Sequence, residues 1–185
     1  MSAAKTLTEA PEKASGRASR RVSTREIERR LQDAQAHCSE RGALLTPLRR
    51  EVLELLLRRH GTAKAYDLQD DMRARHGRVA PTTVYRALDF LMSMQLVHRV
   101  DSVNSFVACQ LDHEHEHLAH QALMLVCSQC GSVSETHAEH ELASALRTLE
   151  RGAAGFEVSA VEIKGRCATC TPRPRAAAAA DKPLA

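Results

Sequence analysis

Hydrophobic residues recur every three or four positions along the first half of the chain, the spacing of helices that bury one face. The segments with this pattern are residues 23–40, 46–61, 65–77 and 81–94. The first begins with a capping box, in which Ser23 and Glu26 would both satisfy backbone donors at the helix start. Thr46-Pro47, a capping hydroxyl followed by proline, predicts the start of the second. The pattern therefore indicates amphipathic helices up to about residue 94.

A two-residue alternation then replaces the helical spacing. Residues 96–100 and 105–109 predict two short strands, and residues 101–104 predict the turn between them. Helices followed by a hairpin form a winged helix, whose last helix before the hairpin usually enters the major groove of DNA. The outward positions of the segment 82–94 are Thr83, Tyr85, Arg86 and Asp89. Arg86 could bond a guanine edge with two hydrogen bonds, although an ordinary amphipathic helix with a solvated face would show the same periodicity.

The second half predicts a smaller unit of three strands and one helix. The strands are expected at residues 122–126, 132–136 and 156–163, and the helix at 139–151. Residues 111–120 form a loop rich in His and Glu, and residues 1–22 and 171–185 look disordered. We therefore expect an α+β protein with a tail (1–22), a winged-helix domain (23–110), a hinge loop (111–121), a small α/β domain (122–170) and a second tail (171–185).

Composition sets only broad limits. The chain has 185 residues, enough for one large or two small domains, and only 3% of them are aromatic, so the core must be mostly Leu, Val and Ala. A net charge of +3 permits nucleic-acid binding without arguing for it. No hydrophobic run reaches the roughly 18 residues of a membrane span, and residues 1–21 lack the hydrophobic stretch of a secretory signal. We expect a cytoplasmic protein with reduced thiols.

Four cysteines form two C-x-x-C pairs, Cys127 with Cys130 and Cys167 with Cys170. Each such turn points two thiolates at one centre, and two turns supply the tetrahedral sulfur shell that suits Zn²⁺. Two disulfides or four buried thiols are the alternatives, but such pairs in a chain without a secretory signal favour a metal or redox site. Metal binding would also stabilise the small domain, since zinc contributes roughly 10–16 kcal/mol in small zinc peptides.

A second group of metal-ligand residues lies outside these cysteines. His98 and Cys109 lie on opposite strands of the expected hairpin, and His120 and Glu135 flank the Cys127 turn. Together they would form a mixed nitrogen, sulfur and oxygen shell suited to zinc. Because this shell would lie between the two halves of the chain, its occupancy could set their relative angle. Separate surface or core residues remain the alternative.

Two further patterns involve histidine. His113-Glu114-x-x-His117 formally matches the H-E-x-x-H motif of zinc proteases, which requires a helix so that both histidines share a face. Asp112 and Glu116 predict an exposed loop instead, which would attract metal loosely or simply be solvated. On the first helix, we expect His37 to be exposed and the neighbouring Cys38 to be a core thiol.

With these residues in view, the chain resembles the Fur family of metal-sensing bacterial repressors, and within it the zinc-sensing branch. The motifs that carry the resemblance lie at residues 45–49, 65–68, 81–91, 96–100 and 104–109, together with the paired C-x-x-C turns. The Thr83-Val-Tyr-Arg86 sequence combined with those turns is highly specific for the family. The resemblance covers about residues 25–170.

The resemblance implies about two zinc ions per chain. The structural zinc would be bound by Cys127, Cys130, Cys167 and Cys170, and the regulatory zinc by His98, Cys109, His120 and Glu135. Counting from Cys109 rather than from Cys127 would select His117 instead of His120. The remaining loop histidines, His113, His115 and His117, would belong to a third, weaker site.

The resemblance also implies a homodimer that binds double-stranded DNA. Its DNA contacts would include Tyr66, Tyr85 and Arg86, with Thr83 beside them, and Asp70 and Arg73 would pair between two dimers on one operator. The function implied is repression of zinc uptake genes from AT-rich inverted repeats when zinc is bound, and not enzyme activity. A sensor of iron, manganese or copper is the alternative within the family. Cys109 argues against iron and manganese, because these harder ions favour nitrogen and oxygen ligands. Outside the family the alternative is a zinc hydrolase built on the His113–His117 loop.

Overall fold

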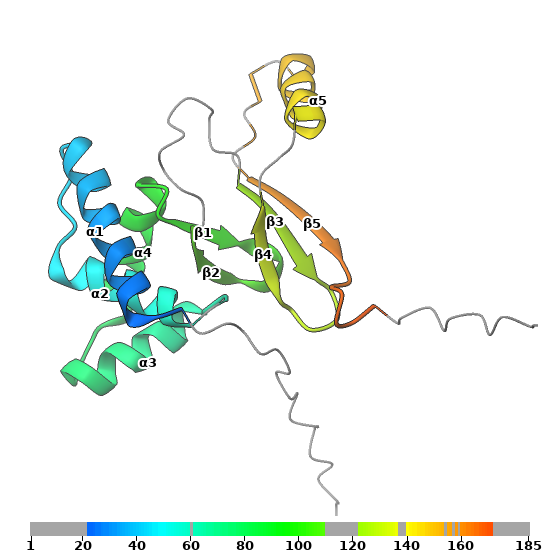
Figure 1. The fold of residues 1–185 in the computed structure, drawn as a ribbon. Coiled ribbons are helices and arrows are strands. Elements are labelled where there is room, and N and C mark those ends of the chain that lie inside the picture. The colour runs from blue at the N-terminus through cyan, green and yellow to red at the C-terminus, as the bar shows by residue number, and fades with distance from the viewer. Residues whose placement is uncertain are drawn as a thin grey trace, which may run out of the picture.

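The computed structural model describes residues 22–59, 61–109, 122–136, 140–153 and 160–171, together with residues 155, 156 and 158. The first half contains α1 (Thr24–Glu40), α2 (Pro47–Arg58), α3 (Ala65–His76), α4 (Pro81–Ser93), β1 (Val97–Val100), the 3-10 helix η1 (Asp101–Val103) and β2 (Ser105–Ala108). The second half contains β3 (Ala122–Cys127), β4 (Val133–Thr136), α5 (His140–Gly152) and β5 (Ala160–Gly165). Figure 1 shows the helices α1 to α4 on one side, the β1–β2 hairpin in the middle and the second sheet beyond it. The expected α+β architecture, a winged helix followed by a small α/β unit, is confirmed.

One hydrophobic core joins the four helices of the first half to the base of the hairpin. Its most buried side chains lie at the positions that the helical spacing selects, among them Val52, Leu68, Val84 and Leu88, each with 0% exposure. At the start of α1, the Ser23 hydroxyl accepts a hydrogen bond from the Glu26 amide at 3.1 Å, as predicted. The Glu26 carboxylate, however, binds the Arg29 guanidinium instead of the backbone, so the reciprocal half of the predicted capping box is wrong.

The second sheet has the strand order β4-β3-β5. Its central strand, β3, runs antiparallel to β4 and parallel to β5. One face of β3 packs on the wing, because Met124 and Val126 form a buried cluster with Val100 and Val107 of the hairpin. The two halves of the chain therefore contact each other through hydrophobic side chains of β1, β2 and β3.

Two local predictions are wrong. The last strand begins at Ala160, not at residue 156, because the chain after α5 first turns: Gly155 has φ +81°, and the Phe156 amide donates to the Ala153 carbonyl at 2.7 Å. His37 is not exposed but 7% accessible, with its Nε2 2.9 Å from the Met94 carbonyl oxygen. The neighbouring thiol, Cys38, is a fully buried core residue, as predicted.

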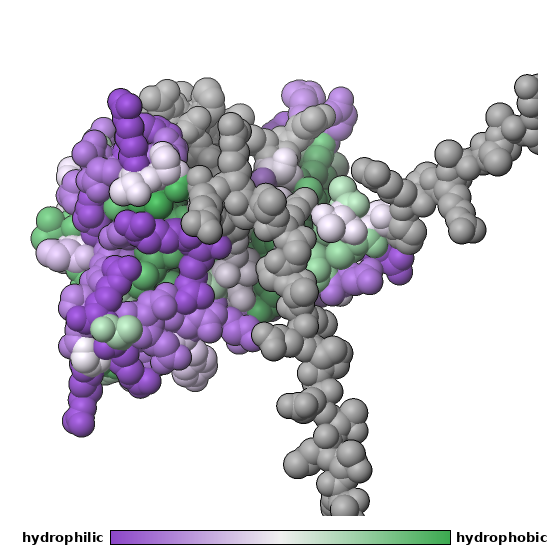
Figure 2. All heavy atoms as spheres, turned by 60° about the horizontal axis from the view of Figure 1, so that its bottom comes forward, coloured by the Kyte–Doolittle hydropathy of each residue, from purple (hydrophilic) through white to green (hydrophobic). Residues whose placement is uncertain are grey.

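Hydrophilic residues cover most of the helical half, whereas hydrophobic residues gather on the visible part of the sheet half (Figure 2). The outer face of that sheet exposes Leu125 and Ile163, at 42% and 44% accessibility. Leu149 on α5 and Phe156 after it are about two-thirds exposed as well, at 63% and 64%. Among the described helices, none has the length and hydrophobicity that crossing a membrane requires.

Candidate metal centres and an exposed helix face

The four cysteines of the C-x-x-C pairs converge at one end of the second sheet. Their sulfur atoms all lie within 4.8 Å of one another. The strand pairing explains this, because β3 and β5 run parallel and Cys127 pairs with Gly165, so the turns that follow both strands lie at the same end. Each turn is closed by a backbone hydrogen bond, from Gly131 to the Cys127 carbonyl and from Cys170 to the Cys167 carbonyl, both at 2.9 Å.

The environment of this cluster lowers the pKa of Cys127 and Cys167 but raises that of Cys170. Backbone N–H groups of Cys167, Cys130 and Gln129 point at the Cys127 sulfur and lower the pKa of that thiol to about 6. Hydrogen bonds from neighbouring thiols, first that of Cys167, raise the pKa of Cys170 to about 12. All six cysteines of the chain are free, so the disulfide alternative does not describe this structure. Four convergent sulfur donors with backbone N–H support fit a tetrahedral zinc ion.

A second cluster lies where the wing meets the sheet. His98 on β1, Cys109 directly after β2 and Glu135 on β4 bring their ligand atoms within 4.8 Å of one another. The Glu135 Oε1 atom is 3.1 Å from His98 Nε2 and 3.5 Å from Cys109 Sγ. The Glu135 side chain is 0% exposed, and Cys109 is 3% exposed. Three of the four predicted regulatory ligands are thus brought together, whereas His120 and its alternative, His117, lie outside the described residues.

The donor set of this second cluster fits a metal ion. His98 Nε2 is buried and has no hydrogen-bond partner among the described residues. Although it lies within ion-pair distance of Glu135, the contact lacks hydrogen-bond geometry, so the imidazole nitrogen keeps an unused lone pair or proton. A buried unsatisfied polar atom costs about 1–3 kcal/mol, and a bound cation would remove that cost. Imidazole, thiolate and carboxylate together are ligands that zinc accepts.

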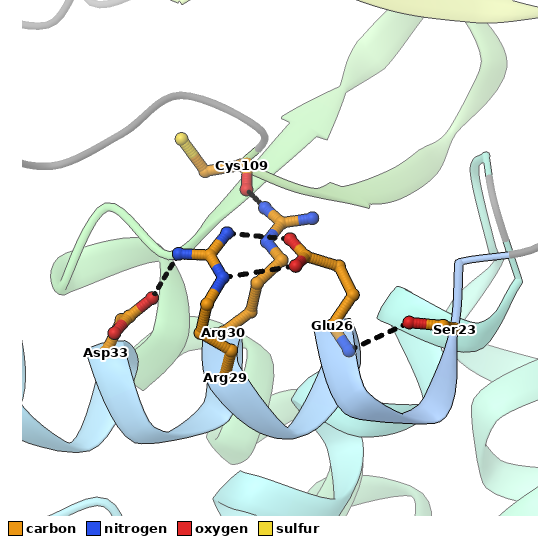
Figure 3. Close-up of polar contacts among 6 residues, drawn as sticks. All are labelled: Ser23, Glu26, Arg29, Arg30, Asp33 and Cys109. Carbon is orange, nitrogen blue, oxygen red and sulfur yellow. Dashed lines mark hydrogen bonds and ion pairs between the residues drawn. The ribbon is translucent and has the colours of Figure 1, made fainter.

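The backbone of Cys109 is held by the helical half. Figure 3 shows the Arg30 guanidinium of α1 donating to the Cys109 carbonyl oxygen, while the neighbouring Arg29 bridges Glu26 and Asp33 along the helix surface. The Cys109 amide donates to the Leu96 carbonyl at 2.9 Å. Both backbone groups of this ligand are therefore fixed by residues of the winged-helix half. Sequence reasoning missed Arg30, because it looked like one more charged residue on a solvated helix.

The outward face of α4 is arranged as predicted. Val84, Ala87, Leu88 and Leu91 are buried, whereas Tyr85 and Arg86 are exposed and Thr83 is partly exposed. Tyr66 on α3 is also exposed, at 66%. Asp70 and Arg73, on the same helix, form an exposed ion pair with each other at 3.3 Å. The four predicted DNA contacts therefore lie outside the hydrophobic core. Asp70 and Arg73, which were predicted to pair between two dimers, pair within one chain in this structure.

The predicted sites in the histidine-rich loop are not tested by the structure. His113, His115 and His117 lie outside the described residues, so neither the third metal site nor the protease-like motif has a structural counterpart here.

The fold joins a winged helix to a small sheet that carries four convergent thiols, and a mixed-ligand cluster lies between the two. These features define a winged-helix protein with two candidate metal centres. Comparison with known proteins is specific. The profile of the ferric uptake regulator family matches residues 40–164. The chain belongs to the ferric uptake regulator family. Since this is a family of transcription regulators and not of enzymes, the chain is not an enzyme, which removes the hydrolase alternative.

Its relatives include zinc-linked members of that family. The chain is 38% identical over 148 residues to the zinc uptake regulation protein of Escherichia coli, covering 76% of this chain and 80% of the relative. A solved structure of a zinc uptake regulator complexed with zinc and DNA has a TM-score of 0.69 and 38% identity, over 80% of this chain and 96% of that one. The structure of holo XcZur has a TM-score of 0.64 and 39% identity, over 76% and 95%.

Proposed function

We propose that this protein is a homodimeric, zinc-responsive repressor that binds AT-rich inverted repeats at zinc uptake genes when zinc occupies the His98–Cys109–Glu135 cluster. The observation that carries the proposal is the convergence of these three ligands from both halves of the chain. The similarity to the E. coli zinc uptake regulation protein and to a regulator solved with zinc and DNA supports both the metal and the partner. A repressor of this kind would act in the cytoplasm.

Zinc bound at this cluster would couple the two halves. His98 and Cys109 belong to the wing, and Glu135 belongs to the sheet, so a shared ion would hold the wing against the sheet. We assign His120, or alternatively His117, as the fourth ligand. Arg30 would transmit the resulting position to α1 through the Cys109 carbonyl. Moving such an equilibrium from 1:99 to 99:1 requires the ion to favour the docked state by about 5.5 kcal/mol.

The ligand chemistry favours zinc over harder ions. Cys109 supplies a soft sulfur donor, whereas iron(II) and manganese(II) favour shells of nitrogen and oxygen. Copper(I) also accepts sulfur and nitrogen donors, and it remains the alternative metal. We propose about two zinc ions per chain, a tightly held structural ion on the four cysteines and an exchangeable regulatory ion between the halves.

DNA would be read by the exposed face of α4. Arg86 can form two hydrogen bonds with a guanine edge, and Tyr85 can pack on a thymine methyl group. Thr83 on α4 and Tyr66 on α3 would add contacts beside them. We assign Asp70 and Arg73 to contacts between two dimers on one operator.

A second copy of the chain would cover the exposed side of the sheet. Leu125 and Ile163 form an exposed hydrophobic pair on its outer face, and among the described strands β5 lies at the edge of the sheet. Leu149 and Phe156 add further exposed hydrophobic surface in the same half. Large exposed hydrophobic surface of this kind marks protein–protein interfaces. Dimerisation through residues 122–170 would present two copies of α4 to an inverted repeat.

Metal analysis and DNA binding test the proposal together. We expect one tightly held zinc per chain plus at least one that a mild chelator removes. The zinc-replete protein should shift an AT-rich palindromic duplex in a gel, and the mildly chelated protein should not. Added zinc should restore the gel shift of the chelated protein, whereas iron(II) and manganese(II) at the same free concentration should not. Equal DNA binding with and without the labile zinc would refute regulation by zinc.

A further inference from the structure

One row of residues across the second sheet directs two carboxylates toward the wing. Met124 on β3 pairs with Glu135 on β4 and with Glu162 on β5. Residues paired in register on neighbouring strands point to the same face of a sheet. Met124 is 1% exposed and packs against Val100 and Val107 of the hairpin, so this face is the one that the wing covers. The proposed regulatory site uses Glu135 only, which leaves Glu162 without an assigned role.

Glu162 holds the tip of the wing through backbone groups. Its Oε1 accepts a hydrogen bond from the Asp101 amide at 2.6 Å, and its Oε2 accepts one from the Ser102 amide at 3.1 Å. These amides open the 3-10 helix η1, and the first amides of any helix lack partners within it. Partial burial raises the pKa of Glu162, but the hydrogen bonds from Ser102 and Asp101 outweigh it and lower the pKa overall. The carboxylate is therefore ionised at neutral pH, and hydrogen bonds to an ionised acceptor are the stronger kind.

The two carboxylates contact the wing at different points, Glu135 at His98 on β1 and Glu162 at the start of η1. His98, which faces Glu135, lies three residues before Asp101, so the two attachment points are about 10 Å apart along the strand. A hairpin held at one point can still pivot, whereas a hairpin held at two points has a fixed orientation. Glu162 needs no metal for its contact, so it can hold the wing in place before zinc arrives.

We propose that Glu162 is a positioning residue that holds the wing tip against the sheet and thereby lowers the zinc concentration at which the His98–Cys109–Glu135 site fills. This inference rests on the proposed function. Zinc binds the docked wing, so its apparent dissociation constant is the intrinsic value divided by the docked fraction. Weakening the contact of Glu162 reduces the docked fraction. A higher zinc concentration is then needed to fill the site.

The first test is Glu162→Gln, which keeps the shape of the side chain and removes its charge. Zinc affinity of the labile site is measured without DNA, by competition with a chromophoric chelator, on the dimer that retains its structural zinc. We expect about a tenfold weaker affinity, and the same shift in the zinc midpoint of DNA binding followed by fluorescence anisotropy. DNA affinity at saturating zinc should stay within about twofold of the wild type. The control is Glu141→Gln, which removes an exposed carboxylate from the first turn of α5.

A second pair of variants removes the donor instead of the acceptor. Asp101→Pro deletes one of the two amides, and the backbone tolerates it because Val100 before it is extended, with φ −112° and ψ 98°. Its control is Asp101→Ala. Both variants lose the ion pair that the Asp101 side chain forms with Arg99 at 2.7 Å, but only Asp101→Ala keeps the amide. We expect Asp101→Pro to weaken zinc binding severalfold relative to Asp101→Ala. It should also have a smaller effect in the Glu162→Gln background, because both changes remove the same bond.

Zinc affinities within twofold of the matched controls in both series would overturn the proposal, as would fully additive effects in the double variant. The DNA-free measurement separates this outcome from failure of the proposed function. If wild-type DNA binding ignores zinc but Glu162→Gln still weakens zinc binding tenfold, the repressor function fails and the positioning role stands.

Discussion

Replacing Cys109 by serine changes one ligand atom at the proposed regulatory site and little else. The residue is 3% exposed, and its sulfur already lies 3.5 Å from Glu135 Oε1, so a serine hydroxyl can donate to the same carboxylate. Arg30 and the Leu96 carbonyl hold the backbone in either case. The buried hydroxyl is therefore satisfied, and we expect at most about 1 kcal/mol of lost stability. In a domain of the size of the winged-helix half, that corresponds to a fall of at most about 4–8 °C in the melting temperature.

The effect on zinc should be far larger than the effect on stability. Loss of a group that merely orients a metal ligand costs about 10–100-fold in metal affinity. Loss of the thiolate of Cys109 itself should therefore cost at least about 100-fold, or about 2.7 kcal/mol. A switch that needs about 5.5 kcal/mol to move from 1:99 to 99:1 would then stop near equal populations. At zinc concentrations that saturate the wild type, only about half of the Cys109→Ser protein should therefore be in the DNA-binding state, and its zinc midpoint should rise by about 100-fold.

The assay is fluorescence anisotropy of a labelled AT-rich palindromic duplex in zinc-buffered solutions, with thermal unfolding measured on the same samples. Cys38→Ser is the matched control, because it removes an equally buried thiol from the core of α1, away from both clusters. That control should lower the melting temperature and leave the zinc midpoint unchanged. A zinc midpoint within threefold of the wild type in Cys109→Ser, or an unfolded Cys109→Ser protein, would refute a regulatory role for this residue.

Three further changes test the other assignments. Cys127→Ser should unfold the sheet half, because structural zinc contributes roughly 10–16 kcal/mol in small zinc peptides; unchanged melting after loss of that zinc would contradict a structural role. Arg86→Ala should relax sequence preference by about 1–3 kcal/mol at one base pair, and an unchanged motif after selection of binding sequences would remove Arg86 from the base-reading set. Ile163→Glu places a charge on the exposed face of the edge strand, so sedimentation should show monomers; a retained dimer would place the interface elsewhere.

The elements of this fold could be predicted because their signals are local. Helical spacing of hydrophobic residues located α1 to α4, and the inward and outward positions of α4 follow directly from that spacing. His37 was assigned wrongly to the surface because its partner is not local. The Met94 carbonyl that accepts it lies 57 residues further along the chain, and a polar residue without a visible partner is normally assigned to solvent.

The two candidate metal clusters also differ in whether their signal in the sequence is local. The C-x-x-C pairs are visible in the sequence because each turn is a local geometry, whereas His98, Cys109 and Glu135 converge only through strand pairing. Arg30 and Glu162 were missed for a further reason. Arg30 binds a backbone carbonyl, and Glu162 binds two backbone amides. Because nearly every residue has these backbone groups, the identity of the residues that they belong to does not reveal the contact.

Strand β3 links the proposed structural centre to the proposed regulatory centre. Cys127, at its end, belongs to the sulfur cluster, and Met124, three residues earlier, lies between the two carboxylates that face the wing. Glu135 reaches its place on β4 only because β4 pairs with β3 directly after the Cys127–Cys130 turn. A sheet with few strands has little core of its own, so loosening of that turn would shift Glu135 and Glu162 together. A sensor of the proposed kind would need to hold its structural zinc much more tightly than its regulatory zinc, because the first ion would maintain the sheet that carries a ligand of the second.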